Sequence, residues 1–331
     1  MVAKIGQLLG VDEAFANLAQ NRTTCRWPTR ETGRLEPSYE PALAPRFRLR
    51  PRSKIFTIGS CFARNIEEHL APLGFDLPML AFGVPAQEWP IRPFARRAGI
   101  LNKYTPPSML QEVMHALAVM ADPGGIDRLT DRLLYPLEND MVIDLELGGY
   151  IPVTLARARE RRRQVFDAFR HAFDEDCVVI TLGLIECWFD ARRHRFLQEA
   201  PNTPALRRET GRFGFKMLDH SEVLATMREL TRRLLETGNP AKRILLTLSP
   251  VPLAATFSGM DVVIANSYGK SVLRAVAQLI RDEFDQVDYF PSYEMVMLSK
   301  EAATWEHDLM HVTDPFVRRI VDTFVRNYIE A

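Results

Sequence analysis

Short apolar runs that end on glycine, serine or proline alternate with helical patterns along most of this chain, and this alternation most constrains its fold. Four runs have the continuous apolar character of buried parallel strands: residues 54–59, 177–183, 243–249 and 287–291. Helical periodicity covers residues 61–73, 105–121, 221–235, 265–284 and 314–328. We therefore predict an α/β protein of three layers, α/β/α, whose ligand site lies at the carboxyl ends of the strands of a parallel sheet.

Composition excludes several classes of function. The chain has 331 residues, of which 47% are hydrophobic, so it is large enough to bury a full core. Its 42 basic and 42 acidic residues balance, so charge predicts neither a nucleic-acid partner nor a membrane partner. The four cysteines show no C-x-x-C spacing, the N-terminus lacks a secretory signal pattern, and no stretch reaches about 18 apolar residues. We therefore expect a cytoplasmic protein.

The first part of the chain predicts an arm rather than a domain. Residues 1–22 fit a short amphipathic helix, and a polar stretch with several prolines follows it. No linker or repeat interrupts the alternation of strands and helices further along the chain. We therefore predict an N-terminal arm over residues 1–50 and one domain over residues 51–331.

Three segments between the main elements carry predictions of their own. Residues 141–147 and 150–155 flank two glycines and predict a hairpin. The five arginines between residues 157 and 163 lie in a helical pattern, which favours a solvated helix face over a binding patch. Residues 192–219 are rich in Arg, Pro and Gly and predict a long surface insertion near the mouth of the site.

The segment Thr57-Ile-Gly-Ser-Cys-Phe-Ala63 places two nucleophilic side chains between a strand and a helix. A side chain just past a parallel strand projects above the sheet, and the amino end of the next helix favours a developing negative charge. The same dipole favours the reactive thiolate form of a cysteine. Ser60 and Cys61 are therefore candidate nucleophiles. The competing interpretation is a tight turn in which Cys61 is a small buried hydrophobe.

A second candidate pair, Asp308 and His311, stands directly before the last predicted helix. Histidine can take a proton from a nucleophile, and a carboxylate three residues earlier can hold its tautomer and stabilise the imidazolium. A loop contact or a helix cap explains the same spacing without catalysis. His307 lacks an aspartate at the matching spacing, so it is not our candidate base. His307 and His311 formally match H-x-x-x-H, but no helical pattern aligns both inward, and we predict no metal site.

These segments together resemble the GSCFA family, named for the motif found here as Gly59-Ser60-Cys61-Phe62-Ala63. Over about residues 50–325, further segments resemble the family's pattern in the same order: residues 181–188, 247–253, 265–274 and 289–294. The family is placed with the SGNH (GDSL-like) hydrolases. The resemblance implies a flavodoxin-like fold and an enzyme that hydrolyses or transfers acyl esters, often acetyl groups on glycans.

The resemblance also implies roles for the residues of the turn. In SGNH relatives a G-D-S turn supplies a serine nucleophile. Placing Gly59-Ser60-Cys61 on that turn residue by residue puts Cys61 at the serine position, whereas a shift of one residue makes Ser60 the nucleophile. We favour Cys61 as the nucleophile and keep Ser60 as the second candidate.

The third block of the SGNH pattern, G-x-N-D, is found here as residues 183–186, with Ile185 in place of the asparagine that donates to the oxyanion. Isoleucine donates no hydrogen bond, so another group replaces it or the chemistry differs. Asn102 is our candidate replacement, with a helix cap or a turn residue as the alternative interpretation. Gly83 is a candidate backbone donor, as the second-block glycine is in the relatives.

Further polar residues have structural alternatives. Glu186 is a candidate substrate-binding or His311-tuning residue, or a carboxylate that complements a helix amino terminus. Asn266, Lys270 and Arg274 are spaced by four residues on one helix face, which favours a solvated stripe or ion pairs over ligand contacts.

Two functions follow from these observations. The first is an ester hydrolase or acyl (acetyl) transferase that uses a Cys/Ser nucleophile with an Asp-His pair on a small-molecule or glycan ester. The alternative is a catalytically inactive carbohydrate-binding or assembly protein of a glycan-biosynthesis pathway, which the lost asparagine supports. Neither function requires a cofactor, and we expect none.

Overall fold

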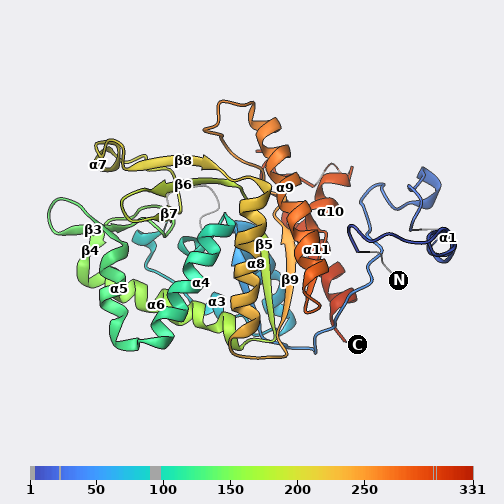
Figure 1. Ribbon diagram of the computed structural model, residues 1–331, viewed down its shortest axis with the longest axis horizontal. Helices are drawn as coiled ribbons and strands as arrows, with labels where there is room; N and C mark the ends of the chain where they lie inside the picture. Colours follow the sequence, from blue (N-terminus) through green and yellow to red (C-terminus); the bar gives the residue numbers. More distant parts are fainter. Residues whose placement is uncertain (1–3, 22–23, 90–97, 301, 303, 331) are drawn as a thin grey trace.

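The computed structural model describes residues 4–21, 24–89, 98–300, 302 and 304–330 (Figure 1). Its α-helices are α1 (Val11–Gln20), α2 (Cys61–Leu70), α3 (Pro78–Ala81), α4 (Pro106–Ala121), α5 (Ile126–Leu133), α6 (Leu155–Asp174), α7 (Pro204–Arg207), α8 (His220–Glu236), α9 (Val262–Glu283), α10 (Ser292–Leu298) and α11 (Asp314–Tyr328). Its strands are β1 (Ile55–Gly59), β2 (Leu134–Pro136), β3 (Met141–Asp144), β4 (Val153–Thr154), β5 (Cys177–Leu182), β6 (Glu186–Asp190), β7 (Arg195–Leu197), β8 (Phe213–Met217), β9 (Arg243–Leu248) and β10 (Val287–Tyr289).

The four predicted apolar runs form one parallel sheet in the order β1-β5-β9-β10. The register pairs Gly59 with Thr181 at the carboxyl ends of β1 and β5, and Leu182 with Leu248 at those of β5 and β9. Consecutive parallel strands require crossover connections, which the helices between them supply. The carboxyl ends of β1, β5 and β9 therefore meet at one edge, where the predicted site lies.

Helices cover both faces of this sheet, because successive side chains of each strand point to opposite sides. Phe56 and Ile180 face a core that α4, α6, α8 and α9 close. Ile55 and Val179 face a second core, which α2, α10 and α11 close. The predicted three-layer α/β/α fold is therefore confirmed (Figure 1).

Helix boundaries follow their caps closely. Thr105 caps α4 by accepting a hydrogen bond from the Ser108 N–H, as a side-chain oxygen at this position commonly does. The last helix buries Phe316, Ile320, Phe324 and Tyr328, which recur every four residues along it. Its N-cap is Thr313, and Asp314 is its first residue, where the predicted helical pattern begins.

A second lobe carries two small antiparallel sheets beside the central one, at the left of Figure 1. The predicted hairpin is confirmed, because β3 pairs with β4, and β2 adds a strand that the sequence did not indicate. The prediction of a long surface insertion over residues 192–219 is wrong, since β7 and β8 pair there with β6 and α7 lies between them. The period-two pattern of Phe213, Phe215 and Met217 is the signal for β8.

The arginine-bearing helix α6 is only partly solvated. Arg159 and Arg163 lie on the surface and pair with acidic residues of α5, as the predicted solvated face requires. Arg161 and Arg162 are buried, so the prediction is wrong for them. Their carboxylate partners are far away in sequence, and periodicity within the helix does not reveal them.

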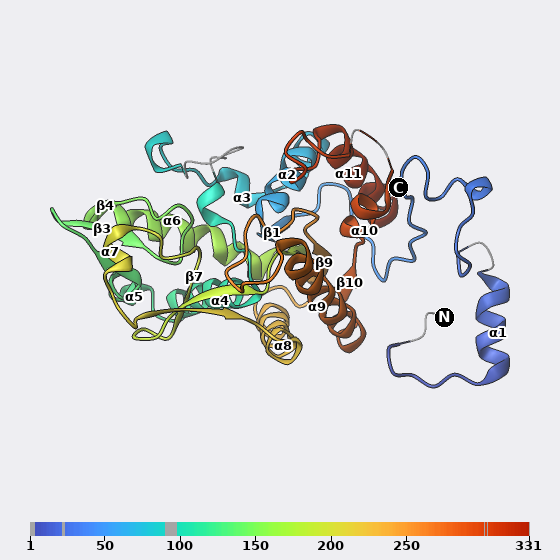
Figure 2. The same ribbon diagram turned by 90° about the horizontal axis from the view of Figure 1, so that it is seen from above.

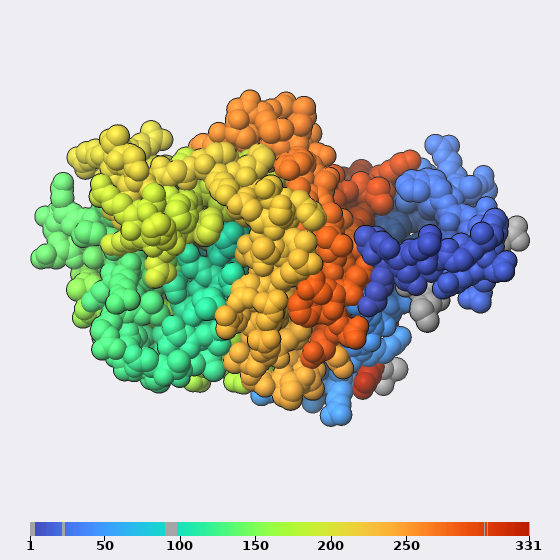
Figure 3. All heavy atoms as spheres, in the orientation of Figure 1, coloured from blue at the N-terminus to red at the C-terminus, as the bar shows by residue number. Residues whose placement is uncertain are grey.

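The N-terminal arm lies at the end of the molecule opposite to the second lobe (Figures 2 and 3). The predicted amphipathic helix is shorter than expected and forms α1, in which no residue is buried. The arm ends where Leu49 forms a parallel bridge with Ile329, so the two ends of the main body meet. None of the described helices combines the length and apolar character needed to cross a lipid bilayer.

Candidate active site

Gly59 ends β1 in a conformation that only glycine adopts readily. Its φ is +155°, and a Cβ at this position would lie 2.5 Å from the carbonyl oxygen of Thr181. Glycine therefore allows the end of β1 to lie against β5. The chain then turns directly into α2, as the sequence predicts.

Ser60 and Cys61 occupy different positions at the start of α2. Ser60 is the N-cap, and its Oγ accepts a hydrogen bond from the Phe62 N–H at 3.3 Å. Its side chain is buried, with 3% of the residue exposed. Cys61 is the first residue of the helix and is partly exposed, so the interpretation of Cys61 as a fully buried hydrophobe is wrong.

Asn102 lies at the same edge of the sheet, because the residues after it bind the ends of two strands. The Lys103 N–H donates to the Gly59 carbonyl at 2.8 Å, and the Leu184 N–H donates to the Tyr104 carbonyl at 2.8 Å. Thr105 caps α4, so Asn102 is not the helix cap. The Nδ2 of Asn102 donates to the Tyr104 hydroxyl at 3.3 Å, and its buried Oδ1 has no hydrogen-bond partner among the described residues.

Gly183 brings this segment and the turn together. A Cβ at Gly183 would lie 2.8 Å from the Tyr104 carbonyl oxygen and 3.6 Å from the Cβ of Ser60. Only a residue without a side chain fits between them. Ser60, Asn102 and the end of β5 are thus neighbours at the carboxyl edge of the sheet.

Lys270 is a buried cation at this edge, so the prediction of a solvated stripe or ion pairs on α9 is wrong for this residue. Its Nζ donates to the carbonyl oxygens of Gly183, Ser249 and Val251 at 2.8–2.9 Å. Burial lowers the pKa of Lys270 to about 7, and the charge of Cys61 opposes this effect. Its three acceptors match the three donors of an ammonium group, whereas a neutral amine has only two, so this geometry favours the charged form.

Asn266 and Arg274, the other two residues of this helix face, also contact other parts of the protein. Asn266 accepts a hydrogen bond from the Leu253 N–H at 3.0 Å. Arg274 forms an ion pair, as predicted, with Glu294 at 2.8 Å, and it stacks over the ring of Tyr289. These contacts are structural, because each fixes a loop or a helix to α9.

Glu186 lines a small hollow together with Gly183, Asn266 and Lys270. It begins strand β6 rather than a helix, so the interpretation as a helix-dipole carboxylate is wrong. Its carboxylate accepts hydrogen bonds from the Thr256 hydroxyl at 2.5 Å and from the Phe257 N–H at 3.4 Å. Glu186 thereby fixes the loop that precedes α9, and a role toward substrate stays a prediction.

Asp308 and His311 form a hydrogen-bonded pair in the loop before α11. The Nδ1 of His311 lies 2.6 Å from Oδ2 of Asp308, and Oδ1 accepts from the N–H groups of Met310 and His311. The hydrogen bonds from the His311 backbone, the imidazole and the Met310 backbone lower the pKa of Asp308 to about 2. The carboxylate acceptor places the proton on Nδ1, which leaves Nε2 as the nitrogen able to act as a base.

The helices that carry the two halves of the predicted site pack on the same face of the sheet. Helices α2 and α11 lie side by side (Figure 2), and His69 Nε2 lies 3.1 Å from Asp314 Oδ1 between them. Phe62 and Val312, the neighbours of Cys61 and His311, belong to one buried cluster. Gly83 lies in the loop after α3, between the buried Phe82 and Val84, and its role as a backbone donor stays a prediction.

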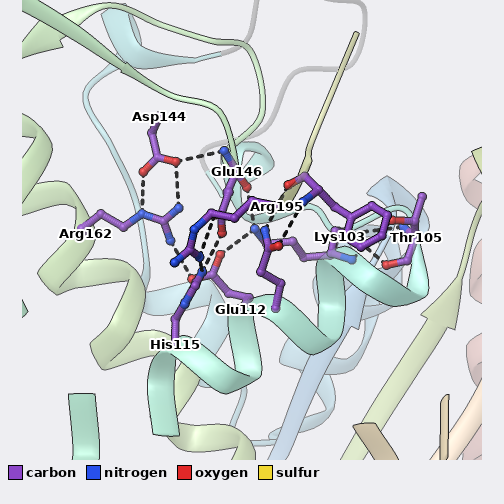
Figure 4. A network of polar contacts seen from close by, with 11 residues as sticks. Lys103, Thr105, Glu112, His115, Asp144, Glu146, Arg162 and Arg195 are labelled. Atoms are coloured by element: carbon purple, nitrogen blue, oxygen red, sulfur yellow. Dashed lines mark hydrogen bonds and ion pairs between the residues drawn. The ribbon is translucent and has the colours of Figure 1, made fainter. Parts of the chain in front are cut away.

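A network of buried charges lies next to this edge (Figure 4). Glu112 lies between two cations, with Lys103 Nζ at 2.6 Å and Arg162 Nη1 at 2.7 Å. Burial raises the pKa of Glu112, but the charges of Arg162 and Lys103 outweigh it and hold the pKa at about 2. Arg162 also binds Asp144, with Nη2 2.8 Å from Oδ1.

The network continues to the second lobe through Glu146, whose carboxylate lies 2.7 Å from His115 Nε2 and 3.2 Å from Arg195 Nη1. The backbone carbonyl of Glu146 accepts from Lys103 Nζ at 2.6 Å. These contacts connect both lobes to Lys103, and through its backbone to Gly59. No local sequence pattern indicates this network, because most of its contacts join segments that are distant in the chain.

The sequence profile of the GSCFA family matches residues 54–324. The chain belongs to the GSCFA family. The match starts just before β1 and ends within α11, so it contains the turn, the Lys103 segment and the Asp308–His311 pair of this GSCFA protein. Membership of the GSCFA family suggests a hydrolase-like protein. No curated protein and no solved structure matches the chain.

Proposed function

We propose that this GSCFA protein is an SGNH-type ester hydrolase or acyltransferase that acts on a glycan or another small ester, with Cys61 as its nucleophile. One observation carries the proposal: Cys61 is the partly exposed first residue of the helix that follows β1, at the carboxyl edge of a parallel sheet. Helix amino termini and sheet edges of this kind favour anionic nucleophiles and ligands. Ser60 is the weaker candidate, because its buried oxygen caps the helix.

The proposed reaction has two steps. His311 Nε2 first takes the proton of the Cys61 thiol, and the thiolate attacks the acyl carbonyl. The tetrahedral intermediate then collapses to a thioester while Nε2 gives that proton to the leaving alcohol. A water molecule or a sugar hydroxyl then gives its proton to His311 and attacks the thioester, which releases the thiolate and the acid or new ester. Asp308 keeps His311 in the required tautomer and stabilises the imidazolium.

The oxyanion needs a donor that Ile185 cannot supply. Ile185 is buried and packs against Gly269 of α9. Asn102 is the side-chain donor that we propose, because the bond from Lys103 to Gly59 keeps it beside the turn. Loss of one such donor typically costs a factor of about 10²–10³ in kcat.

The test is turnover of p-nitrophenyl acetate and of an acetylated glycan by the purified protein. We expect a thioester on the peptide that contains Cys61, detected by mass spectrometry, and loss of turnover in Cys61→Ala and His311→Ala. Cys25→Ala and His307→Ala are matched controls, because both residues are exposed and lie outside the proposed site. Turnover that persists in both site variants would contradict the proposal.

The same assay separates the alternative of an inactive carbohydrate-binding protein. Buried Ile185 at the expected donor position favours that alternative. It predicts no acyl-enzyme, and a saccharide affinity that Cys61→Ala and His311→Ala leave unchanged. Release of free acid indicates hydrolysis, and acyl groups on an added sugar indicate transfer.

A further inference from the structure

The ammonium of Lys270 is buried near the turn that carries the candidate nucleophile, and the protein itself uses all of its hydrogen-bond donors. Only 2% of the residue is exposed, and its three N–H groups donate to three backbone carbonyls at the ends of β5 and β9 and in the loop beyond. No donor is left over for a substrate oxygen. Any effect of Lys270 on the reaction is therefore electrostatic and involves no direct contact with the substrate.

Cys61 is the ionisable side chain of the turn that lies near the charge of Lys270. The Gly183 carbonyl that Lys270 binds belongs to a residue that lies against the turn, because a Cβ at Gly183 would lie 3.6 Å from the Cβ of Ser60, the neighbour of Cys61. A negative charge on Cys61 accordingly opposes the lowering of the Lys270 pKa by burial. Coulomb interaction is reciprocal, so an ammonium that is stabilised by a thiolate stabilises that thiolate equally. The three acceptors that Lys270 Nζ binds are carbonyl oxygens. Glu186 lines the same small hollow, but its carboxylate accepts hydrogen bonds from Thr256 and Phe257.

We propose that the buried ammonium of Lys270 stabilises the thiolate of Cys61 and so makes this cysteine reactive at neutral pH. The inference deepens the proposed function and rests on Cys61 being its nucleophile. Lys270 is then a positioning residue that acts through Cys61. A fixed cation suits a thiol, whose ordinary pKa of about 8.5 lies close to neutral pH, far better than a serine hydroxyl, which needs a base at the moment of attack.

The chain offers matched comparisons for both partners. Lys242 is also buried and donates to two carbonyls, those of Leu234 and Thr237, but the charge that acts on it is Asp174. Cys177 is a buried cysteine in β5, and no cation of the described residues acts on its thiol, whose pKa burial raises to about 12. Lys242 therefore controls for the loss of a buried lysine, and Cys177 shows the behaviour of a thiol without a cation.

The experiment follows alkylation of Cys61 by iodoacetamide against pH, with the modified peptide quantified by mass spectrometry. In the unaltered protein we expect a midpoint below about 8.5, the ordinary value of a thiol. In Lys270→Met the midpoint should rise by at least about one unit, so that alkylation at low pH slows about tenfold. Lys242→Met should leave the midpoint unchanged, and Lys270→Arg, which keeps the charge, should restore most of the shift.

Two results would overturn the inference. One is a midpoint at or above 8.5 in the unaltered protein, a measurement that does not depend on any variant folding. The other is an equal shift in Lys270→Met and Lys242→Met when circular dichroism shows both to be folded. The assay needs no substrate, so a depressed midpoint that depends on Lys270, together with absent ester turnover, would reject the proposed function and keep the inference.

Discussion

The backbone N–H of Lys103 donates to the carbonyl oxygen of Gly59, and the ammonium of the same lysine ends on the carboxylate of Glu112. One residue therefore connects the turn that carries Cys61 to a network of buried charges that reaches into the second lobe (Figure 4). The position of the turn depends on that network as well as on the sheet. This connection gives the buried charges a role in placing the candidate nucleophile.

Replacement of Glu112 by glutamine should be strongly destabilising. It leaves Lys103 and Arg162 buried with less compensating charge, and loss of one partner from a buried pair typically costs about 3–5 kcal/mol. Urea unfolding followed by circular dichroism measures the change. Glu229→Gln is the control, since Glu229 pairs with arginines on the surface of α8, where such pairs contribute below about 1 kcal/mol. Equal losses in the two variants would show that the network does not stabilise the fold.

Stability should fall in acid through the same carboxylate. The pKa of Glu112 is about 2 in the folded protein, against 4.5 for an unperturbed glutamate. A depressed folded pKa gives stability that is fully present above 4.5 and is lost as the pH falls toward 2. Urea midpoints between pH 5 and about 3 should therefore decrease, and the slope should be smaller in Glu112→Gln. An unchanged slope in that variant would assign the acid sensitivity to other groups.

The main sheet and its helices were predictable because their signals are local. The apolar runs of β1, β5 and β9 and the periodicity of α2 and α11 lie within single segments, so the fold class and the positions of the turn followed from the sequence. The Asp308–His311 bond was predictable for the same reason, since three residues separate the partners.

Whether Arg162 and Lys270 are buried could not be predicted from the sequence, because it depends on tertiary contacts. Arg162 resembles its exposed neighbours in the helix until Glu112 and Asp144 are brought to it from 50 and 18 residues away. Lys270 looks solvated on a helix wheel, although it adjoins the apolar face that contains Gly269 and Leu273. Whether a charged residue is buried depends on its tertiary partners, and these partners lie outside the segment that contains the residue.

The turn should not tolerate a side chain at Gly59. Gly59→Ala places a Cβ against the backbone of Thr181, and neither strand end can move without disturbing the sheet. We expect a loss of at least about 1–3 kcal/mol, typical of overpacking, together with loss of esterase activity. Gly214→Ala in β8 is the control, because no atom of the described part of the chain lies within 4 Å of its added Cβ. A Gly59→Ala protein as stable as that control would show that the turn is less constrained than this structure indicates.

Substitutions of Ser60 and Cys61 should have different effects, the first mainly on stability and the second mainly on catalysis. Ser60→Ala removes the cap of α2 and should cost about 1 kcal/mol while ester turnover continues. Cys61→Ala should abolish turnover with a smaller change in stability, because the side chain is partly exposed. Thermal unfolding and p-nitrophenyl acetate hydrolysis measure the two effects. The reverse outcome, turnover lost only in Ser60→Ala, would make Ser60 the nucleophile.

Asp308 should matter through the orientation of His311 rather than through substrate binding. Asp308→Asn removes the charge that stabilises the imidazolium and weakens the preference for a proton on Nδ1, so kcat should fall by a factor of about 10² or more with KM little changed. Since the pKa of Asp308 is about 2, its carboxylate stays ionised across the assay range, and the acid limb of the pH–rate profile should report another group. Asp314→Asn is the control, because that exposed carboxylate contacts His69 and not His311. A kcat that falls equally in both variants would place Asp308 among the residues that only hold the loop.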